Sequence, residues 1–247
     1  MSILTLASLL LAGVAAGVLT TVAGLGGGML LIAGLSLVWP PAVVVATTAP
    51  ALLVGCASRA LLLRDAIAWP TLLRFAGTAA PTAAGASLVA ATLPPALGQG
   101  LVAAFILAGV AHELGAGRAA QAPHAEHPGR LAALAGAIAG LASGLSGGGG
   151  FVATPLLTRA GLAPLEGVAT GAAAMAIVHG AKIVGFGLAD APTQASLPAV
   201  AALTAGLLAG NALGAPLLRR LSRETFRRLT LATLGLTGAW LLGTLPG

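Results

Sequence analysis

The chain of 247 residues is 57% hydrophobic and only 7% charged, whereas soluble domains carry about 25% charged residues. This composition excludes a water-soluble globular domain, and we expect an all-α, polytopic membrane protein. The formal net charge of +6 is explained by basic loops that set the orientation in the membrane, so we expect no nucleic-acid partner. The one cysteine excludes an internal disulfide.

The first half of the chain is predicted to contain a series of apolar segments. They are expected at Ile3–Ala23, Met29–Val38, Ala42–Leu63, Pro70–Thr92 and Ala96–Ala111. The first segment lacks the basic region of a signal peptide, so we interpret it as a retained membrane segment. The second has about ten residues, and a helix of that length, about 15 Å, spans only half of the hydrocarbon core. This second segment therefore cannot cross the membrane alone.

A polar stretch rich in alanine, glycine and proline separates the two halves and is predicted to be a cytoplasmic linker over residues 113–130. A second series of apolar segments follows it. These are expected at Leu131–Leu145, Phe151–Thr158, Leu165–Leu188, Thr193–Leu218 and Leu229–Leu245. The chain is thus divided into a first membrane repeat over residues 1–112 and a second over residues 131–247.

The two halves share motifs in the same order, which indicates an internal duplication. The stretch AGLGGGMLLIAGL, from Ala23, aligns with SGLSGGGGFVATPLL, from Ser143. VATT aligns with VATG, and the same spacing places Arg59 opposite Lys182. Two sets of small residues also align, namely Gly77, Pro81 and Gly85 with Gly206, Gly210 and Gly214.

The basic residues predict that the halves insert in opposite directions. Basic loops face the cytoplasm, and each basic loop of one half aligns with a non-basic loop of the other, as inverted repeats require. The basic positions are Arg64, Arg74, Arg118, Arg130, Arg159 and the cluster from Arg219 to Arg228. Inversion needs an odd number of crossings in each half. We therefore expect each half to be a helical hairpin that enters and leaves by one face, followed by three transmembrane helices, with both termini outside.

Each hairpin is expected to turn at a glycine run inside the membrane. Irregular backbone at that depth survives only where it packs on protein or lines a cavity. The short helix after each run presents unpaired N–H groups and the positive end of its dipole to the membrane interior, which favours an anion. We therefore interpret both runs as substrate-binding, the alternative being tight helix packing through small residues. The runs are Gly26, Gly27 and Gly28 in the first half, and Gly148, Gly149 and Gly150 in the second.

Two cations in apolar segments are candidate ligands for an anionic substrate. Lys182 is the stronger candidate, because an intramembrane cation usually faces a cavity or a partner. Its alternatives are snorkelling to the outer interface and pairing with Asp190. Arg59 lies about one turn from the cytoplasmic end of its segment, where snorkelling is the leading interpretation.

Uncharged polar residues in the spans have competing interpretations. The hydroxyls of Thr47, Thr48 and Thr170 either coordinate an oxyanion or bond the carbonyl one turn back. Asn211 is expected to join two helices, and His179 either relays protons or is a satisfied buried imidazole. No metal-ligand pattern and no cofactor motif is recognised, so neither a metal nor a cofactor is expected.

The motifs GLGGGMLLIAGL and GLSGGGGFVATPLL, together with the ending GNALGAPLLRRLSRETFRRLTLATLGL (Gly210–Leu236), resemble the sulfite exporter TauE/SafE family. The resemblance covers nearly the whole chain. It implies a multi-pass transporter of the cytoplasmic (inner) membrane for sulfite, sulfonates or related small sulfur-containing anions. The first repeat departs from the family pattern, because it has IAGL (Ile32–Leu35) where the second repeat has a proline, Pro155.

The function expected from these features is the transport of a small anion through a midplane site by alternating access between the halves. An alternative is a membrane assembly subunit that transports nothing. An enzyme is not expected, because no nucleophile–base pair or metal-ligand set is apparent in the spans. The expected partners are the anionic substrate and the lipid bilayer, and a homo-oligomer is one option for the assembly.

Overall fold

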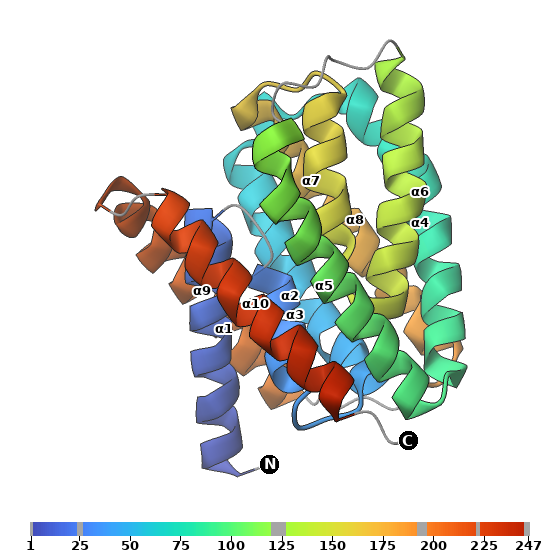
Figure 1. Cartoon of the computed structure of the whole chain (residues 1–247), viewed down its shortest axis with the longest axis vertical. Helices are drawn as coiled ribbons and strands as arrows, with labels where there is room; N and C mark the ends of the chain where they lie inside the picture. The colour runs from blue at the N-terminus through green and yellow to red at the C-terminus, as the bar shows by residue number, and fades with distance from the viewer. Residues whose placement is uncertain (1, 24–26, 120–126, 192–196, 221–222, 245–247) are drawn as a thin grey trace.

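The computed structural model describes residues 2–23, 27–119, 127–191, 197–220 and 223–244, and these are almost wholly α-helical (Figure 1). The first half contains α1 (Ile3–Ala23), α2 (Gly27–Leu35), α3 (Pro41–Leu62), the 3-10 turn η1 (Arg64–Ala66), α4 (Trp69–Thr92) and α5 (Pro95–Ala119). The second half contains α6 (Pro128–Ser146), α7 (Gly149–Arg159), α8 (Pro164–Leu188), α9 (Leu197–Arg220) and α10 (Arg223–Gly243). The all-α, polytopic fold class predicted from the sequence is confirmed.

Proline residues begin several of the long helices. In α3, α4, α6 and α8 a proline occupies one of the first two positions. There its missing N–H costs no hydrogen bond and its fixed φ suits a helix. At the start of α8, the N–H of Ala163 also donates to Oε2 of Glu166 at 3.1 Å. These local signals explain why the observed starts of these four helices lie close to the predicted ones.

The largest difference at a boundary is the end of α5. Hydropathy predicts an end at Ala111, but the helix continues to Ala119, so the first part of the predicted linker is helical. Hydropathy marks where a helix would leave the bilayer, whereas the helix itself persists wherever backbone hydrogen bonds and residue propensity allow. Residues 113–119 read ELGAGRA, which is rich in good helix formers.

The short second arms of the two predicted hairpins are confirmed. α2 has 9 residues and α7 has 11, which at about 1.5 Å per residue is close to half of a bilayer core of about 30 Å. Within the described residues, 5 helices are long and apolar enough to cross a membrane, namely α1, α3, α6, α8 and α9. Each half therefore contains one half-length helix among longer ones.

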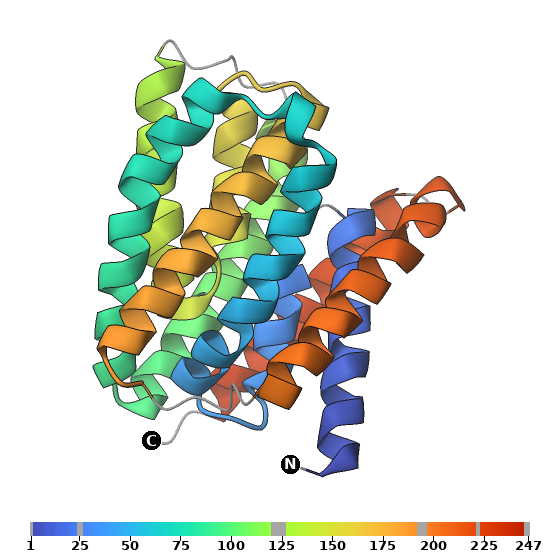
Figure 2. The same ribbon diagram turned by 180° about the vertical axis from the view of Figure 1, so that it is seen from behind.

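The two halves run in opposite directions along the long axis of the molecule. In Figures 1 and 2, α1, α3 and α5 rise from the end that holds both termini, whereas α6, α8 and α10 descend toward it. The packing partners also interchange between the halves. α1 packs chiefly on α9, and α4 packs chiefly on α6, while α3 packs on α8 and α5 on α10. Inverted repeats would produce this interchange; the repeat relation and the orientation of either half in a membrane stay predictions.

The α1–α9 and α4–α6 interfaces depend on glycines that let the backbones touch. A Cβ atom added to Gly13 of α1 would lie 2.7 Å from the carbonyl oxygen of Leu203, and one added to Gly140 of α6 would lie 2.5 Å from that of Ala79. Real Cβ atoms do not approach so closely, so only glycine permits this packing.

The glycines of α9 pack on α1, but the glycines of α4 that align with them have no close neighbour. A Cβ on Gly206 or Gly210 would collide with the backbone of α1, whereas one on Gly77 or Gly85 would meet no atom within 4 Å. The two aligned sets therefore lie on helix faces with different surroundings. Asn211 does join helices as expected, since its Oδ1 accepts from Thr21 Oγ1 at 3.0 Å.

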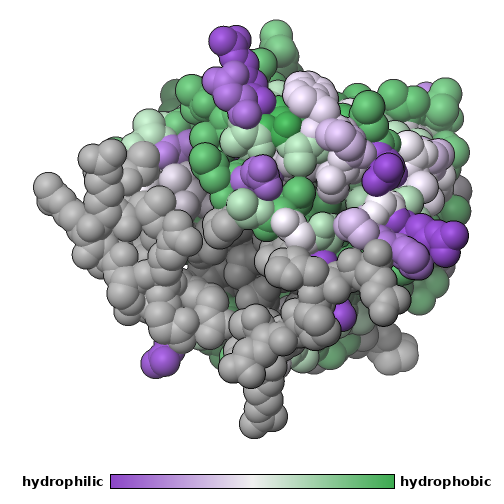
Figure 3. All heavy atoms as spheres, turned by 90° about the horizontal axis from the view of Figure 1, so that it is seen from above, coloured by the Kyte–Doolittle hydropathy of each residue, from purple (hydrophilic) through white to green (hydrophobic). Residues whose placement is uncertain are grey.

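Hydrophilic residues gather at the end opposite the termini, which Figure 3 shows face on. Arg64 and Asp65 form an exposed ion pair at 3.8 Å, and Arg159 is exposed. Trp69, at this end, and Trp240, near the other, are largely exposed, as residues of the two membrane interfaces are.

Candidate functional site

Lys182 is the most completely buried charged side chain among the described residues. It lies in α8, its exposed fraction is 0%, and its Nζ has no hydrogen-bond partner. Neither snorkelling nor pairing with Asp190 explains this, since Nζ reaches no solvent and Asp190 lies exposed beyond the end of α8. An ammonium group buried in this way is destabilising unless an anion compensates for it.

The other candidate cation lies in the facing helix of the first half. Arg59, in the last turn of α3, is half-buried. His179, one turn before Lys182, is also buried, and its Nδ1 has no partner. The helices that carry the two cations paired by the sequence alignment, α3 and α8, pack on each other.

The turn of the second hairpin is buried and requires glycine. Gly147 caps α6 in the left-handed conformation, with φ of 80°, which side chains other than glycine rarely adopt. Its N–H donates to the carbonyl oxygen of Ser143 at 2.9 Å, and the N–H of Gly148 donates to Ser146 Oγ at 3.4 Å. α7 then begins at Gly149, so the chain reverses within three residues.

The tip of this hairpin packs on the first half. A Cβ on Gly147 would collide with Cδ1 of Ile32, and one on Gly148 would lie 2.8 Å from Cε of Met29. Both of these residues belong to α2, the short arm of the first hairpin. In this conformation α2 covers both glycines, and their N–H groups donate within the hairpin.

The remaining glycines of the two runs differ in their surroundings. A Cβ on Gly149 would lie 2.7 Å from Cβ of Ser143 and 3.3 Å from Cε of Met175, whereas one on Gly150 would meet no atom within 4 Å. Gly28 lies beside the side chain of Leu52. Of the other two, Gly27 begins α2, and Gly26 lies outside the described residues.

All three threonines are buried, and none of them is without a partner in the protein. Thr48 Oγ1 donates to the carbonyl oxygen of Val44 at 2.8 Å, which is the bond one turn back. Thr170 Oγ1 accepts from the N–H of Ala68 at 3.0 Å and so connects α8 to the start of α4. Thr47 is fully buried in α3. The arrangement gives no direct support to an oxyanion contact at Thr48 or Thr170.

Sequence reasoning assigned no role to Ser143, whose Oγ is buried without a partner. Ser143 adjoins Gly149, which adjoins Met175 of α8. On α8, spacings of four and three residues place Met175, His179 and Lys182 on one face. Met175 thus lies beside the hairpin turn, and His179 and Lys182 follow on the same face of α8, about 6 Å and about 10 Å further along the helix. A serine just before the glycine run is a weak signal, because only the fold shows that its hydroxyl is unsatisfied.

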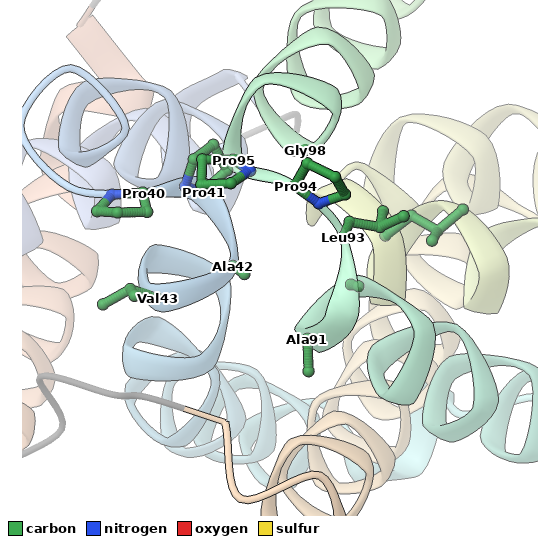
Figure 4. Close-up of a pocket in the computed structure, with 11 residues that line it drawn as sticks. Pro40, Pro41, Ala42, Val43, Ala91, Leu93, Pro94, Pro95 and Gly98 are labelled. Carbon is green, nitrogen blue, oxygen red and sulfur yellow. The ribbon is translucent and has the colours of Figure 1, made fainter.

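A cavity of about 240 Å³ lies at the end of the bundle that holds the termini. Residues from the starts of α3 and α5 and from the end of α4 surround it, and Figure 4 shows the prolines that begin these helices around its mouth. Leu145, which precedes the turn of the second hairpin by one residue, also lines it. The lining residues are apolar, and Lys182 is not among them.

Among the residues that the structure describes, no group of three or more histidine, cysteine or acidic side chains is placed to hold a metal ion.

Comparison with known proteins gives one positive result. The family model for the sulfite exporter TauE/SafE matches residues 9–241, while neither the curated proteins nor the solved structures yield a match. The match covers both hairpins and every long helix. The chain therefore belongs to the sulfite exporter TauE/SafE family, a family of membrane transporters for sulfur-containing anions.

Proposed function

We propose that this chain moves a small sulfur oxyanion or sulfonate across the cytoplasmic membrane by alternating access, with Lys182 as the positive charge that holds the substrate. The observation that carries the proposal is the buried Nζ without a partner. Burial of an ion costs several kcal/mol even after relaxation. A monovalent or divalent anion beside Nζ offsets that cost, so the residue is explained by a ligand and not by the fold.

The hairpin turn supplies the second half of the proposed site. The unpaired N–H groups at the start of α7 and the positive end of its dipole favour negative charge. Ser143 Oγ offers a further donor, and the space beside Gly150 is open. Together with Lys182 these groups match an anion with several oxygens, which accepts many hydrogen bonds.

Access from the end that holds the termini would begin at the cavity beside Leu145. Met29 and Ile32 of α2 cover the turn just beyond it. In the proposed cycle, α2 moves away from the turn, and the anion passes from the cavity to the amides and to Lys182. Movement of one broken helix against the other is a recurrent way to alternate access in transporters built from inverted repeats.

Flux measurements in proteoliposomes test the proposal. Wild-type protein is expected to transport radiolabelled sulfite or a small alkylsulfonate down an imposed gradient, and Lys182→Met is expected to reduce the rate about 100-fold. The exposed Arg159→Gln variant is the matched control and is expected to keep the wild-type rate. Undiminished flux in Lys182→Met would remove Lys182 from the site. An absence of flux for every sulfur anion in the wild type would favour the non-transporting assembly subunit.

A further inference from the structure

A second group of cations lies far from Lys182, at the end opposite the termini. An open hollow of about 560 Å³ is lined by Arg74 of α4 and by the segment from His127 to Arg130 at the start of α6, with Ala133 below. The guanidinium of Arg74 lies directly over Gly129, where a Cβ atom would collide with it. Glycine at this position therefore lets Arg74 and Arg130 line the same hollow.

The cations of this hollow are exposed side chains. Both arginines and His127 are exposed, and among the described residues no carboxylate forms an ion pair with Arg74 or Arg130. Two guanidinium groups converging on one hollow form a site for a group with several anionic oxygens, because each guanidinium can donate two parallel hydrogen bonds. The imidazole of His127 adds another donor.

Each arginine lies at the N-terminal end of an exposed apolar helix face. On α6, Arg130 is followed at helical spacing by Leu134, Ile138 and Leu141, which are 56%, 40% and 46% exposed. Spacings of four and three residues keep such positions on one side of a helix. This face of α6 is apolar along its length and continues along the helix from Arg130, which lines the hollow.

The corresponding face of α4 is apolar and made mostly of small residues. Gly77, Pro81 and Gly85 follow Arg74 at spacings of three and four and are exposed. Leu88 continues the face. Because a Cβ on Gly77 or Gly85 would meet no atom within 4 Å, no described part of the chain covers this surface. α4 and α6 pack on each other, so a cationic hollow joins two uncovered apolar faces.

The depth of the hollow suits a lipid headgroup. Trp69 begins α4 and is 57% exposed, as an interfacial tryptophan is. Arg74 lies five residues further along the helix, or about 7–8 Å. Basic pockets between transmembrane helices at the cytoplasmic side bind the headgroups of anionic lipids.

We propose that Arg74, His127 and Arg130 bind the phosphate of an anionic phospholipid, whose acyl chains lie along the exposed faces of α4 and α6. The charge complementarity of the hollow and its continuity with those apolar faces identify the occupant. The site is separate from Lys182 and does not depend on the proposed transport.

Fluorescence quenching in lipid nanodiscs tests this site. In a Trp39→Phe/Trp240→Phe background, Trp69 is the remaining tryptophan and reports on lipid beside α4. Dibrominated phosphatidylglycerol, diluted into phosphatidylcholine, is expected to quench Trp69 at a far lower mole fraction than dibrominated phosphatidylcholine does. Arg74→Gln/Arg130→Gln is expected to weaken the apparent affinity for phosphatidylglycerol about 30-fold, and each single variant about fivefold.

The control variant is Arg159→Gln, which removes an exposed arginine of the same end and is expected to leave the quenching curve unchanged. Equal quenching by the two lipids in the unsubstituted background would overturn the proposal. Displacement of the lipid by millimolar inorganic phosphate would also overturn it, because the site would then take a soluble anion. A change of oligomeric state in the double variant, with no loss of lipid selectivity, would identify the face as a contact between copies of the chain and reject the lipid. Circular dichroism of each variant verifies that it is folded.

Discussion

The helices α3 and α8 align in sequence and pack on each other, but the single cation of each helix has a different environment. Arg59 lies in the last turn of α3 and is half-buried, whereas Lys182 lies well inside α8 and reaches no solvent. Positions that align in sequence therefore have different environments in the structure. A long side chain near a helix end extends its charge to the interface, but one enclosed by protein needs a partner.

The largest expected effect is the change in stability caused by Lys182→Met, and Arg59→Met is the comparison. Lys182→Met removes a buried, unpartnered charge while keeping the length of the side chain, so we expect the free energy of unfolding to rise by about 2–4 kcal/mol. Arg59→Met is expected to change it by less than about 1 kcal/mol, because its charge is partly solvated. Equilibrium unfolding in detergent micelles measures both. A loss of stability in Lys182→Met would mean that the ammonium group is satisfied in the folded protein, and the contrast would disappear.

A second contrast concerns glycines of α9 and α4 that align in sequence but have different surroundings in the structure. Gly206→Ala is expected to destabilise the protein by about 1–3 kcal/mol, because the methyl group collides with the backbone of α1. Gly77→Ala is expected to stabilise it by up to about 1 kcal/mol, since alanine favours the helix and the space is open. Similar losses of stability for Gly206→Ala and Gly77→Ala in thermal unfolding would contradict this difference.

The smallest effects are expected at the threonines of the aligned VATT and VATG motifs. Thr170→Val leaves the N–H of Ala68 without its acceptor and should cost about 1–2 kcal/mol. Thr48→Val removes only a bond within its own helix and should cost less than about 0.5 kcal/mol. Chemical denaturation measures the free energy of unfolding of both variants. If instead Thr48→Val abolished sulfite flux with its stability intact, the hydroxyl would be a ligand and the first half would contribute more to the site than Arg59 suggests.

Much of the fold could be predicted because its signals are local. Apolar length identified the helices, prolines marked their starts, and the two short segments identified α2 and α7 as half-length arms. The continuation of α5 to Ala119 was missed because hydropathy does not report on helix formation in water.

The site was less predictable because its decisive contacts join the two halves. Lys182 stood out as a cation in an apolar run, and the structure places it in full burial. That Met29 and Ile32 cover the turn at Gly147 follows from packing between hairpins far apart in the chain, which no local pattern encodes. The unsatisfied hydroxyl of Ser143 has the same origin, since a serine in an apolar helix ordinarily bonds the preceding turn.

The interchange of partners between the halves has a consequence for how the protein is made. α1 is synthesised first, but its main partner, α9, is nearly the last helix to leave the ribosome. Its glycine face must stay among lipids, or against the translocation machinery, during most of translation. α4 and α6 can associate much earlier, so assembly should begin in the middle of the chain and finish at its ends. Each half of the chain therefore completes its fold only with helices of the other.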